Sequence, residues 1–197
     1  GNFGNAYSAW FGRSNGLPVN KILCSTNVND VLRRFIETGE LAPEKTLPSV
    51  APSMDIQIPS SLERLIFDFT DGASAFYDAL LKEHKAKLSD DKIIQLNHIF
   101  SSSTFLDDDI KSEIKSLYEE FGSIFDPHSV TSIRMALNNQ DSVPTVAVAT
   151  ASPEKFSNVI APLVETASEV VIDDKEEYLK LDNDIFAISE SIKAYFS

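Results

Sequence analysis

The feature that most constrains the fold is the alternation of short apolar runs with segments of helical periodicity. Residues 21–25 (Lys-Ile-Leu-Cys-Ser) and 145–149 (Thr-Val-Ala-Val-Ala) are short, largely apolar runs that are typical of buried strands. Segments with apolar residues at helical spacing precede and follow each run. Strands that alternate with helices predict an α/β fold of three layers, in which helices flank a parallel sheet.

The expected helices have recognisable ends. Residues 31–38 form a predicted helix with one apolar face, which Asn29 can cap and Gly39 can end. Residues 72–121 have helical patterns throughout, with breaks near 88–89 and 101–104. This segment predicts extra helices that form a covering layer.

The chain of 197 residues is long enough for one compact domain. We expect residues 1–60 and 122–175 to supply the sheet portion and residues 61–121 the helical covering portion. Residues 40–59 contain four prolines and predict a long irregular segment, of a kind that is usually functional or mobile. A last helix is expected near residues 185–196.

The composition excludes several classes of function. The net charge of −13 argues against a nucleic-acid partner, and no apolar run is long enough to suggest a membrane partner. The single Cys24 excludes an internal disulfide and a cysteine-rich zinc site. No second histidine lies close to His128, so no metal site is expected. A reducing, cytoplasmic setting fits this cysteine usage.

The chain opens on a glycine-rich turn, Gly-Asn-Phe-Gly-Asn at residues 1–5, directly before a predicted helix. Backbone N–H groups and the helix dipole at such a place favour a phosphate. The same residues could equally form an ordinary turn that caps a helix. Because the chain begins inside this turn, we expect it to be cut from a longer polypeptide.

Polar residues that follow the predicted strands or lie in the turns are further candidates for ligand contacts. Ligands of parallel α/β sheets bind beyond the carboxyl ends of the strands. Each group also has a structural interpretation, as a helix cap or an Asx turn. The candidates are Asn27, Asn29 and Asp30 after the first strand, Ser53 and Asp55 in the proline-rich segment, Asp126 and His128 at a helix start, and Thr150 and Ser152 after the second strand.

The order of these motifs is more specific than any one of them. It runs through Gly-Asn-Phe-Gly, Thr-Asn-Val-Asn-Asp with Arg34-Phe35, Ser-Met-Asp-Ile, Asp-Pro-His and Thr-Ala-Ser-Pro-Glu-Lys-Phe. In this order the chain resembles the threonine synthase family. The resemblance covers nearly the whole chain and is weakest in residues 72–121.

The resemblance implies the carboxyl-terminal part of a pyridoxal 5'-phosphate (PLP) enzyme with the tryptophan synthase β-like fold, present here only in part. The family is a group of lyases that convert O-phospho-L-homoserine and water into L-threonine and phosphate. The resemblance implies that Gly1, Asn2, Phe3, Gly4 and Asn5 bind the cofactor phosphate and that Thr150 hydrogen-bonds the pyridine nitrogen. Motif positions near the substrate and pocket are Asn27, Asn29, Asp30, Arg34, Ser53 and Asp126.

The chain departs from the family pattern in two ways. Ser152 stands where many members have histidine. The lysine that forms the Schiff base with PLP lies upstream of the glycine turn in the family and is absent here. Lys155 matches a structural position, and Lys21 and Lys45 match no Schiff-base motif. Since PLP chemistry needs that amine, we expect the chain to be inactive without the missing amino-terminal half of the same polypeptide.

Two other functions compete with this interpretation. One is another PLP lyase of the same fold type, such as a serine or threonine dehydratase, although Asn2 and Phe3 make the turn less glycine-rich than is usual there. The other is a non-catalytic binding or regulatory domain, which the absence of the lysine favours.

Overall fold

The computed structural model describes residues 1–70, 72–140, 142–164, 184, 189–191 and 193–194. The helix expected near residues 185–196 therefore lies for the most part outside the described residues. No helix in the described part is both long and apolar enough to cross a membrane. In chain order the elements are α1 (Gly4–Ser14), β1 (Ile22–Thr26), α2 (Val31–Thr38), β2 (Glu40–Leu41), η1 (Pro52–Met54), α3 (Leu62–Thr70), α4 (Ser74–Glu83), β3 (Ala86–Lys87), α5 (Asp90–Ile99), β4 (Phe100–Thr104), α6 (Asp107–Phe121), α7 (Pro127–Asn138), η2 (Pro153–Phe156) and α8 (Ser157–Ile160).

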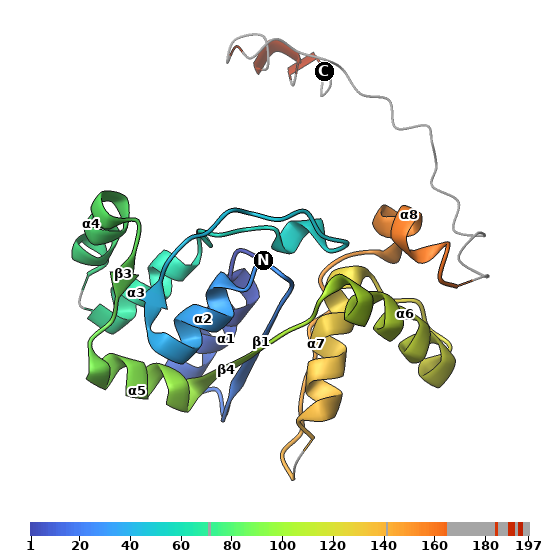
Figure 1. Ribbon diagram of the computed structural model, residues 1–197, viewed down its shortest axis with the longest axis horizontal. Helices are drawn as coiled ribbons and strands as arrows, with labels where there is room; N and C mark the ends of the chain where they lie inside the picture. The colour runs from blue at the N-terminus through green and yellow to red at the C-terminus, as the bar shows by residue number, and fades with distance from the viewer. Residues whose placement is uncertain (71, 141, 165–183, 185–188, 192, 195–197) are drawn as a thin grey trace.

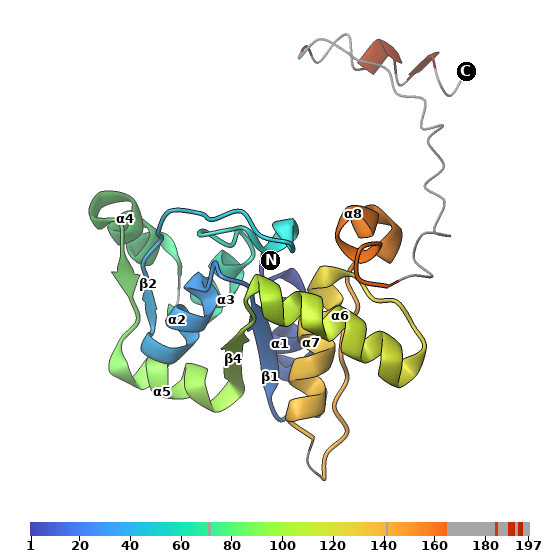
Figure 2. The same cartoon turned by 45° about the vertical axis from the view of Figure 1, so that its right-hand side comes forward.

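Strands β1 and β4 form a parallel pair at the centre of the structure (Figure 1 and Figure 2). The register places Ile22 opposite Phe100 and Thr26 opposite Thr104. Helix α2 packs against both strands, and α1 and α7 pack against β1. A short antiparallel pair joins β2 to β3. Parallel strands with flanking helices confirm the predicted α/β class.

Strand β4 lies where we expected only a break between covering helices, inside the segment 61–121. The prediction that residues 72–121 contain only helices and breaks is therefore wrong, because the break at 101–104 is a strand. Hydroxyl groups help to fix β4 beside β1: Ser102 Oγ donates to the Cys24 carbonyl oxygen at 2.6 Å, and the hydroxyl oxygens of Thr26 and Thr104 lie 3.0 Å apart. A search for apolar runs misses such a strand because serines occupy its middle positions.

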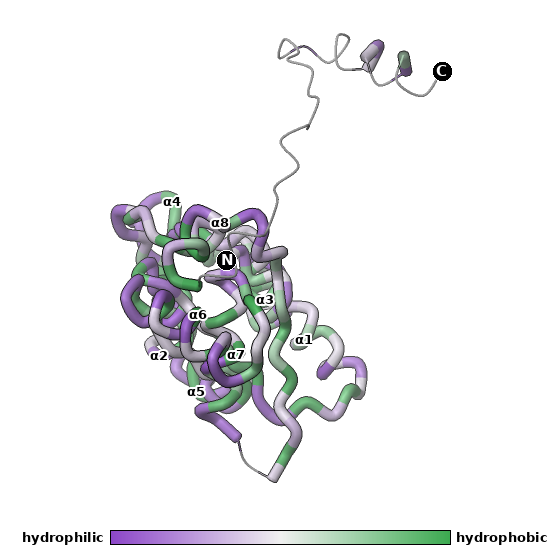
Figure 3. The backbone as a smooth tube through the Cα atoms, turned by 90° about the vertical axis from the view of Figure 1, so that its right-hand side faces the viewer, coloured by the Kyte–Doolittle hydropathy of each residue, from purple (hydrophilic) through white to green (hydrophobic). Residues whose placement is uncertain are grey.

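The prediction of a second strand at residues 145–149 is also wrong. This segment is extended but exposed, with Val146 84% and Val148 52% accessible to solvent. Figure 3, coloured by hydropathy, shows hydrophobic positions along the stretch of backbone that follows α7. A strand becomes stable when a neighbouring strand pairs its backbone groups, and neither ladder of the described residues includes this segment.

The start of α2 also differs from the prediction. Its N-cap is Asp30 rather than Asn29, and the Asn29 side chain instead contacts Leu47. The end of α2 is as predicted: Gly39 has φ +72°, a left-handed conformation that glycine adopts without steric cost.

The buried apolar side chains form two clusters. The first surrounds β1 and β4 and includes residues of helices α1 to α5. The second joins α6, α7 and α8. Ala51 and Met54, from the proline-rich segment 40–59, belong to the second cluster. This irregular segment therefore connects the two clusters.

We predict that Phe100→Ala lowers the free energy of unfolding by about 3–5 kcal/mol, because it leaves a cavity in the first cluster. The Phe100 ring is 1% exposed and its centroid lies 5.7 Å from that of Phe3 and 6.4 Å from that of Trp10. Urea denaturation measures the change. Phe67→Ala, at a position 60% exposed, is the matched control, and equal losses in the two variants would contradict the placement of β4 in the core.

Candidate functional site

The turn before α1 leaves the N-terminus of this helix open. Phe3 is the N-cap residue, with φ +70°, and no side chain caps the helix. The first turn of α1 carries no acidic residue, and Gly4 and Asn5 are exposed. The Phe3 ring is buried against Phe100 and holds the turn in place. Backbone N–H groups at the positive end of a helix dipole favour an anion at this place.

The proline-rich segment 40–59 and the two serines that follow it pack against this turn. A Cβ atom on Gly1 would lie 2.9 Å from the Ser53 carbonyl oxygen, so a larger residue would force the backbone to shift. The Ser61 N–H donates to the Asn2 carbonyl oxygen at 3.0 Å, and the Ser60 N–H donates to the Asn2 side-chain oxygen at 3.3 Å. In Figure 1 and Figure 2, η1 accordingly lies beside the amino terminus.

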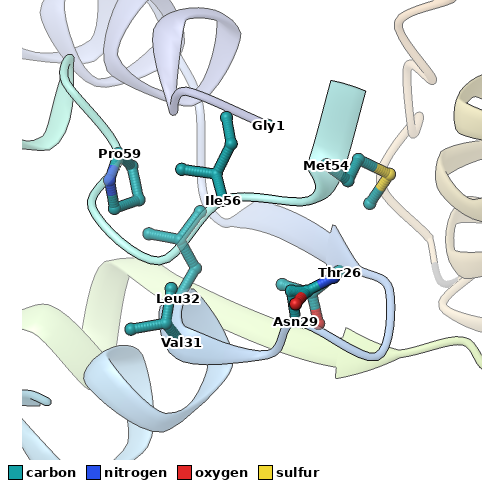
Figure 4. A pocket seen from close by; sticks show the side chains of 8 residues that line it. All are labelled: Gly1, Thr26, Asn29, Val31, Leu32, Met54, Ile56 and Pro59. Carbon is teal, nitrogen blue, oxygen red and sulfur yellow. The ribbon is translucent and has the colours of Figure 1, made fainter. Parts of the chain in front are cut away.

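A small pocket opens between the glycine turn and the carboxyl end of β1 (Figure 4). Three of the predicted segments meet there: the glycine turn, the end of β1 with the following turn, and the proline-rich segment. Its polar wall comes from the end of β1, and its apolar wall comes from α2 and the proline-rich segment. The lining residues are Gly1, Thr26, Asn29, Val31, Leu32, Met54, Ile56 and Pro59.

The side chains of Asn27 and Asn29 form hydrogen bonds that hold the proline-rich segment against the end of β1. Asn27 Nδ2 donates at 2.7 Å to Asp55 Oδ1 and also lies 2.7 Å from Ser49 Oγ. Asn29 Nδ2 donates to Asp55 Oδ1 at 3.0 Å and to the Leu47 carbonyl oxygen at 2.8 Å, and Asn29 Oδ1 accepts from the Leu47 N–H at 2.8 Å. These bonds use both amides to fix the shape of the pocket wall.

Asp30 and Arg34 form an ion pair at the start of α2. Arg34 Nε lies 3.0 Å from Asp30 Oδ1, and Arg33 donates to the other carboxylate oxygen. Burial alone would raise the pKa of Asp30, but the hydrogen bonds from Arg33 and Arg34 outweigh burial and lower it. Arg34 Nη1 donates to the Ala42 carbonyl oxygen at 3.0 Å, whereas Nη2 is buried without a partner among the described residues.

Asp126, at the start of α7, links two distant segments. Its Oδ1 accepts from the His128 N–H at 2.9 Å and lies 2.7 Å from His128 Nδ1, and its Oδ2 accepts from Ser129 Oγ. His128 Nε2 accepts from the Ser53 N–H at 3.1 Å, and Ser129 Oγ accepts from the Thr150 N–H at 2.9 Å. A continuous chain of hydrogen bonds therefore runs from Ser53, beside the glycine turn, to Thr150.

The direction of these bonds assigns the protonation states. Because His128 Nε2 accepts a hydrogen bond from a backbone N–H, the proton of the neutral imidazole is on Nδ1 and points at Asp126. Burial alone would raise the pKa of Asp126, but hydrogen bonds from His128 and Ser129 outweigh burial and lower it. The Asp126 carboxylate is therefore charged at neutral pH.

The structure does not bring every predicted residue into one cavity. Gly1 and Asn29 line the pocket, whereas Thr150 is exposed and does not. The sequence offered His128 with Asp126 as a candidate for ligand contacts, with a helix start as the alternative, and did not single out Ser129. The available signal was their spacing, since they are the second and third residues after the helix cap Asp126.

Other kinds of chemistry find no support in the described part of the chain. No group of three or more His, Cys, Asp or Glu side chains there could hold a metal ion. Burial raises the pKa of the Cys24 thiol to about 12, which keeps the sulfur protonated and unreactive as a nucleophile.

Parallel strands with flanking helices define an α/β protein, and its small pocket lies at the strand end where proteins of this class bind ligands. Comparison with known proteins narrows this class. No protein-family model matches the chain. The sequence is 32% identical to threonine synthase from Pseudomonas aeruginosa over an alignment of 166 positions, which covers 81% of this chain and 35% of that relative. It is 28% identical to threonine synthase from Corynebacterium glutamicum over an alignment of 211 positions, which covers 98% of this chain and 44% of the relative.

A crystal structure of PLP-bound threonine synthase from Brucella melitensis matches with a TM-score of 0.84 and 26% identity, over 99% of this chain and 44% of that chain. The chain is therefore a relative of the threonine synthases and has part of their fold. It spans 35% to 44% of the length of these three proteins.

We predict that Asp126 contributes stability that is present above the ordinary carboxyl pKa of 3.8 and is lost as the pH falls through the lower pKa of the folded state. Asp126→Asn keeps a residue that caps helices well but removes the charge. The difference in free energy of unfolding between wild type and variant should therefore shrink below about pH 4. Urea denaturation as a function of pH measures this.

Asp108→Asn is the control, because the Asp108 side chain is fully exposed. Its effect should be small at every pH. A difference at Asp126 that stays constant down to about pH 3 would contradict the lowered pKa.

Proposed function

We propose that this chain is the carboxyl-terminal part of a PLP-dependent threonine synthase, a lyase of threonine biosynthesis. The complete polypeptide would convert O-phospho-L-homoserine and water into L-threonine and phosphate. The observation that carries the proposal is the open N-terminus of α1. The glycine turn before this helix packs against Ser53, and a chain of hydrogen bonds connects Ser53 to Thr150. The relationship to the threonine synthases, one of them PLP-bound, supports it.

The glycine turn has the chemistry that a cofactor phosphate needs. The position of Gly1 has no room for a side chain. The position of Gly4 is more open, because the nearest atom to a Cβ placed there would be Ser61 Oγ, 3.9 Å away. Neutral backbone amides and a helix dipole can hold a phosphate without a cluster of cations, which suits a chain of net charge −13. We assign the cofactor phosphate to Gly1, Asn2, Phe3, Gly4 and Asn5.

Thr150 is our candidate for the contact to the pyridine nitrogen of PLP. Its N–H donates to Ser129 Oγ at 2.9 Å, which fixes its backbone at the start of the turn into η2. A neutral hydroxyl can share a hydrogen bond with the pyridine nitrogen but, unlike a carboxylate, would not hold it protonated. When bound, PLP supplies the electron sink that labilises the α and β protons of the substrate, before phosphate leaves and water adds.

The remaining motif residues have supporting roles in this proposal. Asn29 lines the pocket, and Arg34 keeps one buried N–H donor group without a partner among the described residues. The other residues hold the backbone around the pocket, because their hydrogen bonds are made within the protein. Those residues are Asn27, Asp30, Ser53 and Asp126.

We further propose that the lysine that attaches PLP lies in the remainder of the polypeptide, so that this chain alone is inactive. Lys21 directly precedes β1 and donates to the carbonyl oxygens of Asn97 and His98, at 2.7 and 3.2 Å. It therefore lies at the opposite end of the strand from the pocket. Lys155 is exposed on η2. The cytoplasmic location expected from the sequence stays a prediction.

The exposed segment 143–149 is our candidate for a contact with the remainder of the polypeptide. Val146 and Val148 expose apolar side chains along an extended backbone that neither described ladder includes. Extended segments of this kind are stabilised when they pair with a further strand and bury their apolar face. The chain spans less than half the length of its relatives, so the remainder could supply that strand.

We predict that PLP and borohydride leave one trapped lysine adduct in the complete polypeptide, outside residues 1–197. The isolated chain should show no site-specific lysine adduct, because no lysine of the described residues lines the pocket. Peptide mass spectrometry locates the modified lysine. A single stoichiometric adduct on Lys21, Lys45 or Lys155 of the isolated chain would contradict the proposal.

The activity assay of the complete polypeptide separates the competing functions. With O-phospho-L-homoserine, a threonine synthase releases phosphate and L-threonine in equal amounts. With L-threonine as substrate, a dehydratase instead releases ammonia and an oxo acid. Binding of PLP without either reaction would favour a non-catalytic domain.

We predict that this chain and the separately expressed remainder of the polypeptide associate, and that Val146→Asp weakens the association by at least about tenfold. A charge at a position that becomes buried costs several kcal/mol, which is more than this factor requires. Analytical ultracentrifugation or isothermal titration measures it. Leu81→Asp is the control, because Leu81 is 77% exposed but lies on α4. Equal losses in the two variants would exclude the segment 143–149 as the contact.

A further inference from the structure

We propose that Asp126, His128 and Ser129 form a positioning unit that couples the glycine turn to Thr150 and so fixes the separation between two ends of one bound ligand. None of the three lines the pocket of Figure 4, so they act through Ser53 and Thr150 rather than on the ligand. The identity of that ligand, PLP, rests on the proposed function, whereas the coupling itself rests on the hydrogen bonds alone.

The unit reaches two segments that are far apart along the chain. His128 lies 75 residues after Ser53, and its Nε2 accepts a hydrogen bond from the Ser53 N–H. The Ser53 carbonyl oxygen faces Gly1. Ser129 lies 21 residues before Thr150, and its Oγ accepts a hydrogen bond from the Thr150 N–H. The two acceptors are adjacent in sequence, and both side chains also bond the carboxylate of Asp126. One carboxylate therefore orients both contacts.

The environment of the unit restricts it to one arrangement. Asp126 is 0% exposed, Ser129 1% and His128 8%. The His128 ring packs edge-on against Phe156, with ring centroids 4.6 Å apart. Buried polar groups that are fully hydrogen-bonded rigidify their surroundings, because an alternative arrangement would leave one of them without a partner.

Helix capping alone does not account for these contacts. As a cap, Asp126 needs only to accept from the backbone N–H groups of His128 and Ser129, and it does so. The same carboxylate also receives both side chains. The bond to Nδ1 selects the tautomer in which Nε2 is free to accept from Ser53, and the bond from Ser129 Oγ directs its oxygen lone pairs to Thr150.

The test is amide hydrogen exchange at Ser53 and Thr150, measured by NMR on the 197-residue chain without cofactor. His128→Asn should speed exchange at Ser53 directly and, through Asp126, at Thr150. Ser129→Ala should speed exchange at Thr150 directly and at Ser53 through the same carboxylate. We expect about a tenfold increase at the direct site, as the loss of one hydrogen bond predicts, and a smaller increase at the other.

Two matched controls separate coupling from general loosening of the fold. His84→Asn changes an exposed histidine that ends α4, and Ser116→Ala removes a hydroxyl on α6 that contacts Arg134. Neither should change exchange at Ser53 or Thr150. If His128→Asn affects only Ser53 and Ser129→Ala only Thr150, the coupling is refuted.

The consequence for the ligand is tested in the complete polypeptide, by titrating PLP into wild type, the two single variants and the double variant. A coupled unit predicts that the losses of affinity are not additive, because either substitution already disturbs the shared carboxylate. Additive losses would overturn the proposal. Failure of the wild type to bind PLP would instead reject the proposed function and leave the exchange experiment to decide the coupling.

Discussion

The arrangement of the site depends on the carboxylate of Asp55 in the proline-rich segment. Asn27 and Asn29, which follow β1, both donate to its Oδ1, and Ser49 donates to it as well. These bonds tie an irregular segment to the end of a buried strand. The same segment then places Ala51 and Met54 in the second apolar cluster and Ser53 against Gly1. One partly buried set of hydrogen bonds to a carboxylate therefore determines how the pocket, the glycine turn and α7 meet.

The site that we propose suits a ligand whose negative charge is held by backbone N–H groups. The first turn of α1 contains no acid, and the Arg33 and Arg34 side chains near the pocket pair with Asp30 rather than standing free. Near the pocket, this arrangement leaves the N-terminus of α1 as the main attraction for an anion. Specificity would then come from the fixed geometry of the turn and of Thr150, which explains why so many of the motif residues bond to one another.

The sequence predicted the elements that have strong local signals. The strand β1, the apolar face of α2 and the cap Asp126 followed by proline are recognisable because periodicity and capping act over a few residues. Strand β4 was missed because its pairing with β1 and its hydroxyl contacts depend on residues far away in sequence. The segment 145–149 was taken for a strand because its composition is right, but pairing needs a neighbour that composition does not reveal. The roles of His128 and Ser129 were hidden for the same reason, since their partners Ser53 and Thr150 are close only after folding.

The parallel pairing of β1 with β4 also bears on how the chain reaches its native state. Thr26 and Thr104 are 78 residues apart, so their ladder closes a long loop before it gains any hydrogen bond. Contacts of such high sequence separation slow folding. On a ribosome, β1 cannot pair with β4 until the segment from α2 to β4 has been synthesised. Until then its unpaired backbone N–H and C=O groups can pair with a strand of another chain, which makes β1 a site of misassociation in the nascent polypeptide.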